Sequence, residues 1–230
     1  MRVIMISGAS RGIGLEIARE MTRRGHAVSV GVRRPSSVPD ELAKLPHVLV
    51  HAYDAADRQS HVAWIAATLA RFDRIDALVN NAGTAPFISL EAGTDEALDE
   101  VFEINVKAPF RLIQAALPYL KQSGSGRVIN VASLSGKRVY GLNAGYQMSK
   151  HALVALTHAV RRVGFEHGIR ASAICPGFVA TDMTAGVVDV PRTEMTDPKD
   201  IALLAATLLE LPNSASIAEL LINCRYEHTL

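Results

Sequence analysis

The stretch Val3–Gly14, VIMISGASRGIG, decides the fold. Val3–Ser7 is a short apolar run that predicts a buried strand, and a helix begins near Gly12. The glycines of the turn remove side chains where the backbone bends and where a pyrophosphate can approach a helix N-terminus. Their GxxxGxG spacing differs from the usual dinucleotide fingerprint GxGxxG. We therefore expect a dinucleotide site here; the alternative is a tight turn that needs glycine for steric reasons only.

The rest of the chain repeats this alternation of strand and helix, which is typical of a parallel sheet covered by helices. The 230 residues suit one domain, so we expect residues 1–230 to form a single α/β, Rossmann-like, doubly wound fold with a seven-stranded, mostly parallel sheet flanked by helices. The expected strands are Val3–Ser7, Val28–Val32, Val48–Tyr53, Ala77–Asn80, Arg127–Ala132, Arg170–Ile174 and Ile217–Ile222. The expected helices lie near 12–24, 60–71, 95–121, 146–167 and 198–210.

One long region, residues 178–196, has no clear periodicity. It follows the end of an expected strand, and open α/β sheets bind ligands at that edge. We expect this region to be a substrate lid; an ordinary surface loop is the alternative.

Composition excludes several classes of function. The formal net charge of +1 gives no reason to expect a nucleic-acid partner. The longest apolar run, Ile201–Leu211, is about half of a membrane span, and no signal peptide is visible. Cys175 and Cys224 are too few for a disulfide framework, so we expect a cytoplasmic protein. The eight histidines show no metal-binding spacing, and we expect no metal site.

Tyr146 and Lys150 lie four residues apart in the run YQMSK, so they share one face of a helix. A neighbouring ammonium favours the phenolate and lowers the pKa of a tyrosine, which suits general acid–base chemistry. Ser133 lies thirteen residues upstream of the tyrosine. The alternative is a half-buried tyrosine beside a solvated lysine.

The second expected strand indicates which dinucleotide binds. NAD sites place an acidic residue at the end of this strand to hold the ribose 2′-hydroxyl. Here Arg33 and Arg34 follow the strand, and a guanidinium can bind a 2′-phosphate through paired hydrogen bonds. Arg11, inside the glycine turn, offers another positive charge. We therefore expect NADP(H) as the cofactor, the alternative being that these arginines are solvated loop residues.

Six motifs then occur in the order seen in the short-chain dehydrogenases/reductases, and the chain resembles the compact branch of that family, of about 250 residues. They are SGASRGIG at 7–14, NNAG at 80–83, Asn105 in EINVKAPF, Ser133 in NVASLSG, YQMSK at 146–150 and PGFVAT at 176–181. The resemblance extends from Val3 to about residue 210.

The resemblance implies a role for each catalytic residue. Tyr146 would be the acid/base, and Lys150 would lower its pKa and bind the nicotinamide ribose. Ser133 would hold and polarise the substrate carbonyl. Asn105 would anchor a water that links Lys150 to solvent. Each also has a structural alternative: Asn105, for example, could merely bridge helices.

The same resemblance implies a set of cofactor contacts. Asp54 would accept a hydrogen bond from the adenine amino group, although it could instead cap the next helix, for which Asp57 is the better candidate. The other expected contacts are Gly8, Ser10, Arg11, Gly12, Ile13, Gly14, Asn81, Ala82, Gly83, Pro176, Gly177, Val179 and Thr181, together with Tyr146 and Lys150.

These observations predict an NADP(H)-dependent oxidoreductase that interconverts a small-molecule carbonyl and a secondary alcohol. Alternatives are a dehydrogenase of a small hydroxy compound, such as a 3-hydroxy acid, and a non-catalytic NADP(H)-sensing regulator. Candidate substrate contacts are Leu134, Tyr140, Asn143, Phe178 and Phe87.

The expected assembly is a homodimer or a homotetramer. The final stretch IAELLINCRYEHTL lacks the Asp-Gly-Gly segment with which many relatives build a tetramer, so the tetramer is in doubt. A dimer would use the faces of helices 95–121 and 146–167.

Overall fold

A computed structural model describes residues 1–226 and contains a seven-stranded sheet. The strands run in the order β3-β2-β1-β4-β5-β6-β7, and every neighbouring pair is parallel. This confirms the doubly wound fold and shows that all seven strands are parallel, where the sequence predicted a mostly parallel sheet. They are β1 (Val3–Ser7), β2 (Ala27–Val32), β3 (Val48–Ala52), β4 (Ala77–Asn80), β5 (Arg127–Val131), β6 (Arg170–Pro176) and β7 (Glu219–Ile222).

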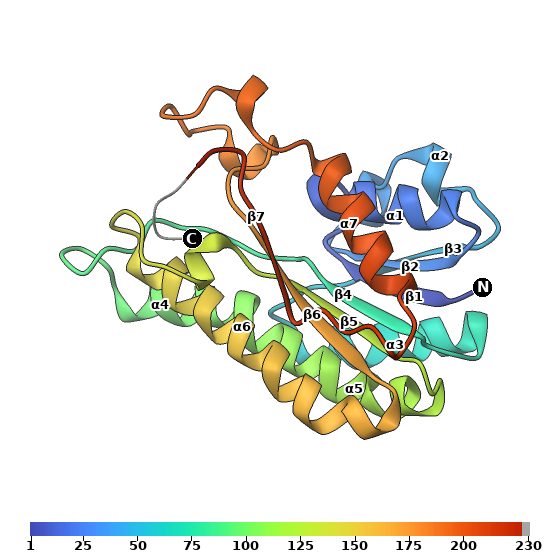
Figure 1. The fold of residues 1–230 in the computed structure, drawn as a ribbon. Coiled ribbons are helices and arrows are strands. Elements are labelled where there is room, and N and C mark those ends of the chain that lie inside the picture. The colour runs from blue at the N-terminus through green and yellow to red at the C-terminus, as the bar shows by residue number, and fades with distance from the viewer. Residues whose placement is uncertain (227–230) are drawn as a thin grey trace.

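Helices cover both faces of the sheet (Figure 1). Two of them, α1 and α7, pack on one face, and α3, α5 and α6 pack on the other. The helices are α1 (Gly12–Arg23), α2 (Asp40–Ala43), α3 (Arg58–Phe72), α4 (Asp95–Phe102), α5 (Ala108–Gln122), α6 (Ala144–Gly164) and α7 (Pro198–Glu210). Within residues 1–226, no helix combines the length and the apolar character that crossing a bilayer requires.

The core consists of two apolar layers because the central strands are buried on both faces. In β1, Ile4 and Ile6 join the layer under α1 and α7, whereas Met5 joins the opposite layer. This is the two-residue alternation of a strand, and it explains why the sequence shows continuous apolar runs. Gly31 of β2 makes room for the Trp64 indole, because a Cβ there would lie 2.7 Å from the Trp64 ring.

Side-chain caps define where several helices begin. Asp57 caps α3 by accepting a hydrogen bond from the Gln59 N–H at 2.9 Å, which confirms it as the better cap than Asp54. Asp197 caps α7 by accepting from the Lys199 N–H at 2.8 Å. The end of the long loop is therefore fixed where the sequence predicted a new helix.

The single helix expected over 95–121 is wrong in detail. The structure divides it into α4 and α5, joined by a π-helical segment, Glu103–Lys107. Such wider turns frequently mark functional sites. Within this segment, the Asn105 side chain bonds to Thr84 in another loop and not to its own helix.

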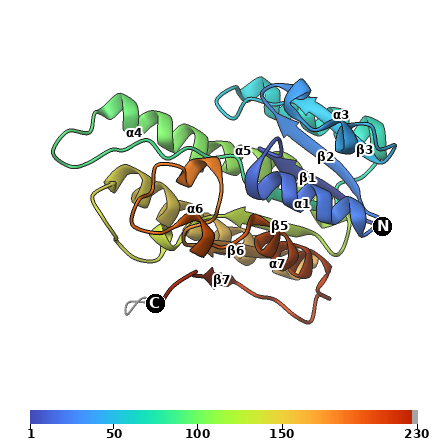
Figure 2. The ribbon, with the colours of Figure 1, turned by 90° about the horizontal axis from the view of Figure 1, so that it is seen from above.

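Loops from distant parts of the chain meet at the carboxyl ends of the strands. Figures 1 and 2 show that the segments after β4, β5 and β6 gather at the end of the sheet opposite the N-terminus. The expected lid, 178–196, belongs to this group. It is not fully irregular, because it holds two 3-10 turns and a parallel bridge between Val179 and Thr196.

Candidate active site

The glycine turn leads into α1 without a side-chain cap. Gly8 and Gly12 have φ angles of 71° and 57°, the left-handed region that favours glycine. No side chain caps the N-terminus of α1, so its first N–H groups are available to an anion. Ser10 and Ile13 of the turn are half-buried. These features fit a pyrophosphate.

Asn81 ties the glycine turn to the end of β4. Its Nδ2 donates to the backbone oxygens of Ser7 and Gly8, both at 3.0 Å. The Ser7 hydroxyl in turn accepts from the N–H groups of Asn81 at 3.1 Å and Ala82 at 3.0 Å. Asn81 and Ala82 thus lie beside the glycine turn, as the resemblance implies, and Asn81 also holds the two strand ends in place.

The residues expected to select the cofactor divide into two groups. Arg33 and Arg34 are exposed after β2, and within residues 1–226 no carboxylate pairs with either. Arg11 instead forms an ion pair with Asp182 of the loop after β6, at 3.1 Å. Asp54 is exposed, and its Oδ1 accepts from the Ala56 N–H at 3.0 Å. The free guanidinium groups therefore lie at the end of β2, while the charge of Arg11 is already matched.

Lys150 is buried beside the end of β5. Its side chain is almost inaccessible, and Nζ donates to the Val131 carbonyl oxygen at 2.9 Å. Nζ lies 5.6 Å from the centroid of the Tyr146 ring. Burial lowers the pKa of Lys150 to about 8. The lysine and the tyrosine are therefore neighbours on α6, but the ammonium bonds to the backbone.

The expected lowering of the tyrosine pKa is wrong for the protein by itself. Tyr146 is half-buried, and the surrounding protein raises its pKa because it disfavours the phenolate. The hydrogen bond from the Ser133 side chain acts in the opposite direction and lowers the pKa. A second cation close to the phenol would be needed to lower its pKa.

Ser133 follows β5 and is half-buried between two backbone groups. Its hydroxyl accepts from the Ser135 N–H at 3.1 Å and donates to the Pro176 carbonyl oxygen over a long 3.4 Å. That second bond is weak, so the hydroxyl hydrogen can be redirected to a substrate at little cost. The loops that follow β5 and β6 therefore meet at Ser133.

Asn105 is buried, and its side-chain donors are fully used. Oδ1 accepts from the Thr84 N–H, and Nδ2 donates to the Thr84 carbonyl oxygen and to Ser149 Oγ. A Cβ at Gly83 would lie 3.2 Å from Asn105 Oδ1 and 3.8 Å from Lys150 Nζ. The residue is thus in the expected place beside Lys150, and it bridges a loop to two helices. The water that it would anchor stays a prediction.

Asn143, a predicted substrate contact, bonds to three backbone groups. Its Oδ1 caps α6 by accepting from the Tyr146 N–H at 3.3 Å and also accepts from the Ile88 N–H at 3.1 Å. Its Nδ2 donates to the Pro86 carbonyl oxygen at 2.9 Å. Because every strong bond of this amide goes to backbone, Asn143 positions the helix that carries Tyr146.

Gln147 was missed in the sequence. It is buried, and its amide bonds to the loop before α6: Oε1 accepts from the Tyr140 N–H at 3.1 Å, and Nε2 donates to the Gly141 carbonyl oxygen at 3.2 Å. The signal that could have revealed it is an amide directly beside Tyr146, which needs partners if that face of the helix is buried.

The remaining candidates surround the loop after β6. Thr181 lies over the glycine turn, since its methyl group would be 3.3 Å from a Cβ at Gly12. Leu134 is buried, and its Cδ1 would lie 3.1 Å from a Cβ at Gly177. Pro176 and Val179 are buried as well, whereas Phe87 is 71% exposed.

Tyr140 and Phe178 are brought together by a residue that the sequence did not single out. The Arg225 guanidinium carbon lies 5.9 Å from the Tyr140 ring centroid and 5.5 Å from that of Phe178. Arg225 follows β7 in a segment without periodicity, so no pattern in the sequence pointed to it.

Comparison with known proteins identifies relatives over the whole described fold. Residues 2–191 match the family described as short chain dehydrogenase. An agropine synthesis reductase from Rhizobium rhizogenes is 41% identical over 227 residues, covering 98% of this chain and 53% of that protein. The chain therefore spans about half the length of the agropine synthesis reductases that it matches.

Solved structures agree with the fold along its full length. An alcohol dehydrogenase from the archaeon Thermococcus sibiricus, complexed with 5-hydroxy-NADP, is 30% identical, covers 99% of this chain and 98% of its own, and has a TM-score of 0.89. A 3-ketoacyl-(acyl-carrier-protein) reductase from Brucella melitensis, complexed with NADH, gives a TM-score of 0.90 with 97% of both chains covered. At 24% identity, the second likeness concerns the fold alone.

Proposed function

The chain belongs to the short-chain dehydrogenase family of oxidoreductases, and on that premise we propose that it interconverts a carbonyl and a secondary alcohol with NADP(H). The observation that carries the proposal is the meeting of Tyr146, Ser133 and Lys150 at the carboxyl end of β5. A proton donor, a hydroxyl donor and a cation at the switch point of a doubly wound sheet fit carbonyl reduction.

The residues around the turn fit the adenine half of an NADP molecule. The uncapped N-terminus of α1 would hold the pyrophosphate, and the unpaired Arg33 and Arg34 would hold the 2′-phosphate. Asp54 keeps one carboxylate oxygen for the adenine amino group. The Thermococcus alcohol dehydrogenase is a complex with an NADP derivative, which supports NADP(H) as the cofactor, whereas the Brucella reductase is a complex with NADH.

Nicotinamide supplies or accepts the hydride when it is bound. The protein supplies the proton, which Tyr146 carries because its phenol is protonated at neutral pH. In reduction, Tyr146 donates its proton to the carbonyl oxygen as negative charge develops there. Ser133 turns its hydroxyl hydrogen from Pro176 to the same oxygen.

Lys150 is suited to restore that proton. Its pKa of about 8 keeps it mostly charged at neutral pH but makes it a better proton donor than an exposed lysine. As charge moves to the phenolate, the ammonium 5.6 Å from the ring stabilises it. The bond of Nζ to Val131 holds the cation in place during this change.

The test is consumption of NADPH over a set of ketones, aldehydes, diketones and keto esters. We expect turnover of at least one class and its loss, by about 10³-fold or more, in Tyr146→Phe. NADPH affinity should stay within about threefold in that variant, since only a hydroxyl is removed. A Tyr146→Phe protein that reduces carbonyls at the wild-type rate would contradict the proposed mechanism.

Two alternatives are tested by adding the reverse assay, in which alcohols are supplied with NADP⁺. If only the alcohol is oxidised, the protein is a dehydrogenase of a small hydroxy compound. If NADPH binds and no substrate turns over, it is a cofactor-sensing regulator. We further propose that it acts in the cytoplasm as a homodimer or homotetramer. Light scattering of the purified protein would test the oligomeric state.

A further inference from the structure

A cation from the end of the sheet reaches the two aromatic side chains that were expected to contact substrate. Arg225 lies three residues after β7, and its Nη2 donates to the Tyr140 hydroxyl at 3.2 Å. Its guanidinium also lies 5.5 Å from the centroid of the Phe178 ring. Arg225 thereby joins the loop after β5 to the loop after β6. Within residues 1–226, no other arginine contacts both of these rings.

The surroundings of Arg225 connect it to the reacting groups. Phe178 is two residues from Pro176, whose carbonyl oxygen accepts from Ser133. Tyr140 is held through its N–H by Gln147, the residue beside Tyr146. Arg225 therefore contacts two loops near the reacting groups. The loop after β5 carries the Ser133 hydroxyl and leads into the helix of Tyr146, and the loop after β6 begins beside Pro176, the partner of Ser133.

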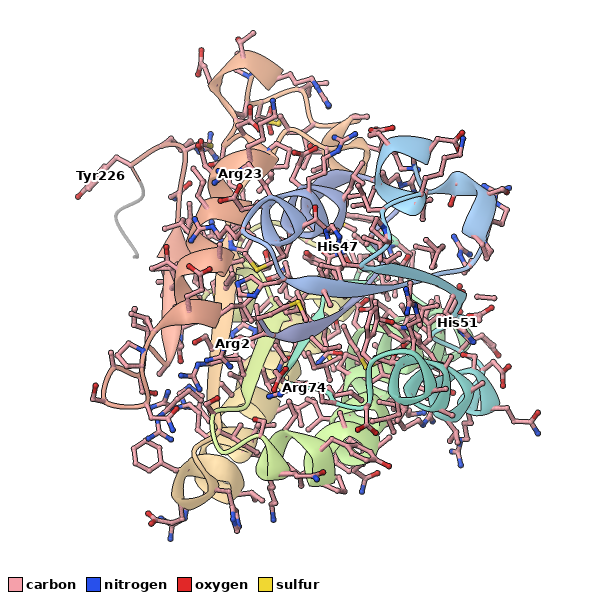
Figure 3. All side chains as sticks on the ribbon, turned by 90° about the vertical axis from the view of Figure 1, so that its right-hand side faces the viewer. Arg2, Arg23, His47, His51, Arg74 and Tyr226 are labelled. Carbon is pink, nitrogen blue, oxygen red and sulfur yellow. The ribbon has the colours of Figure 1, made fainter. Side chains whose placement is uncertain are left out.

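The Arg225 backbone is anchored at the same place. Its N–H donates to Asn223 Oδ1 at 3.4 Å, and that oxygen would lie 2.9 Å from a Cβ at Gly177. A side chain at position 177 would collide with this anchor. The segment after β7 is thus seated on the loop after β6, and Tyr226 beyond it is 80% exposed at the margin of the molecule (Figure 3).

The charge of Arg225 is not matched within the described part of the chain. No carboxylate there lies within ion-pair distance of it. The nearby Lys137 differs, because it pairs with Glu219 at 2.6 Å, and Glu219 also binds His158. Arg138 lies 5.0 Å from the Tyr140 ring centroid. An exposed, unmatched guanidinium with two aromatic walls suits an anionic ligand.

We propose that Arg225 and the Tyr140 hydroxyl bind the carboxylate of an oxo-acid substrate, while its carbonyl lies at Ser133 and Tyr146. This inference rests on the proposed function and narrows its substrate class. One guanidinium matches the single charge of a carboxylate, to which it can donate two parallel hydrogen bonds. The rings of Tyr140 and Phe178 would contact the carbon chain between the two groups.

The reaction leaves the carboxylate unchanged. A hydride adds to the carbonyl carbon, Tyr146 gives its proton to the carbonyl oxygen, and the product is the hydroxy acid with oxidised cofactor. The only role of Arg225 is recognition, so its removal should affect acids and not their uncharged esters.

The experiment compares 2-, 3-, 4- and 5-oxo acids with their methyl esters, using wild-type protein, Arg225→Ala, Arg225→Lys and a control. The control is Arg162→Ala, which removes an exposed arginine of α6 that makes no hydrogen bond or ion pair with residues 1–226. We expect the wild type to prefer the acid at one spacing by about 10- to 100-fold in kcat/KM. Arg225→Ala should remove that preference, Arg225→Lys should keep part of it, and Arg162→Ala should keep all of it.

A binding measurement separates this inference from the proposed function. The same acids and esters are titrated into Tyr146→Phe loaded with NADPH, and binding is followed by the fluorescence of the cofactor. If no carbonyl turns over in the wild type, the proposed function fails, yet tighter binding of acids that depends on Arg225 would still support the anion site. Equal binding of acids and esters, or an equal loss of both in Arg225→Ala, would overturn it.

Discussion

Asn105 and Thr84 are joined by a reciprocal pair of hydrogen bonds, both 2.9 Å long: the Thr84 N–H donates to Asn105 Oδ1, and Asn105 Nδ2 donates to the Thr84 carbonyl oxygen. The Asn105 side chain thus offers Thr84, in the loop after β4, the same pair of donor and acceptor that a neighbouring β-strand would offer. Because a third bond reaches Ser149 on α6, the amide fixes that loop against the helix that carries Tyr146.

Asn105→Ala should therefore lower the free energy of unfolding by about 2–4 kcal/mol, since three buried hydrogen bonds are lost and their partners stay buried. It should also lower kcat, because the loop beside Lys150 loses its support. Urea unfolding and steady-state kinetics measure the two effects. The control is Ser149→Ala, which leaves the bonds to Thr84 intact and should cost less than half as much. Equal losses in both variants would show that the Thr84 bonds are unimportant.

Lys150→Met should make the protein more stable while removing its activity. Burial lowers the pKa of Lys150 from 10.5 to about 8, so the charged form is disfavoured by about 3 kcal/mol at neutral pH. Loss of the hydrogen bond to Val131 lowers the free energy of unfolding by about 1 kcal/mol and so offsets part of this gain. The net gain of about 2 kcal/mol should appear in urea unfolding at pH 7. A destabilised variant would show that the buried ammonium contributes to folding.

The same lysine predicts how stability depends on pH. Between about pH 8 and 10.5 the folded protein has released the Lys150 proton while the unfolded chain still holds it. Because the unfolded state then binds more protons, the wild type should gain stability relative to Lys150→Met as the pH rises through this range. Unfolding curves for both proteins at pH 7, 8, 9 and 10 would measure the difference, and a constant difference would exclude the linkage.

Gly14→Ala should damage the glycine turn. A Cβ at this position would lie 2.4 Å from Asn81 Nδ2 and 2.6 Å from the Gly8 carbonyl oxygen. The Asn81 side chain, which joins the ends of β1 and β4 by hydrogen bonds, would therefore have to move. We expect a loss of about 1–3 kcal/mol in stability and a weaker affinity for NADPH. Gly186→Ala is the matched control, because a Cβ there meets nothing within 4 Å. Thermal melting of the two variants should differ clearly.

Replacing Arg33 and Arg34 by alanine should change cofactor preference. If they bind the 2′-phosphate, the Kd for NADPH should rise by about 10- to 100-fold, whereas that for NADH should change by less than about threefold. Fluorescence titration of both cofactors measures this ratio, with Arg162→Ala as the control. A wild-type protein that binds NADH and NADPH equally would refute the cofactor assignment.

The strands could be predicted because burial on both faces leaves continuous apolar runs, as in AVSVGV of β2. The π-helical segment within 95–121 could not be predicted, and the bond that Asn105 of this segment makes to Thr84 joins residues 21 positions apart. Periodicity describes one helix at a time and carries no information about such a partner.

The site divides in the same way. Tyr146, Lys150, Ser133 and Asn105 lie in motifs of fixed spacing, and the structure brings them together. Asn143 was assigned to the substrate because it lies near those motifs, but proximity in sequence does not show that its amide bonds to the 86–88 loop. For the protein without a bound cofactor, the direction of the Tyr146 pKa differs from the prediction, because the sequence shows a nearby cation and does not show burial.

The interior position of β1, between β2 and β4, has a consequence for biosynthesis. This first strand pairs with β2 on one side and β4 on the other, and the Val3 N–H donates to Asp76, 73 residues further along the chain. One edge of β1 therefore stays unsatisfied until residues 76–80 have left the ribosome. Pairings of such long sequence separation form slowly. The nascent chain should accordingly need protection from aggregation until β4 emerges, and folding should accelerate at that point.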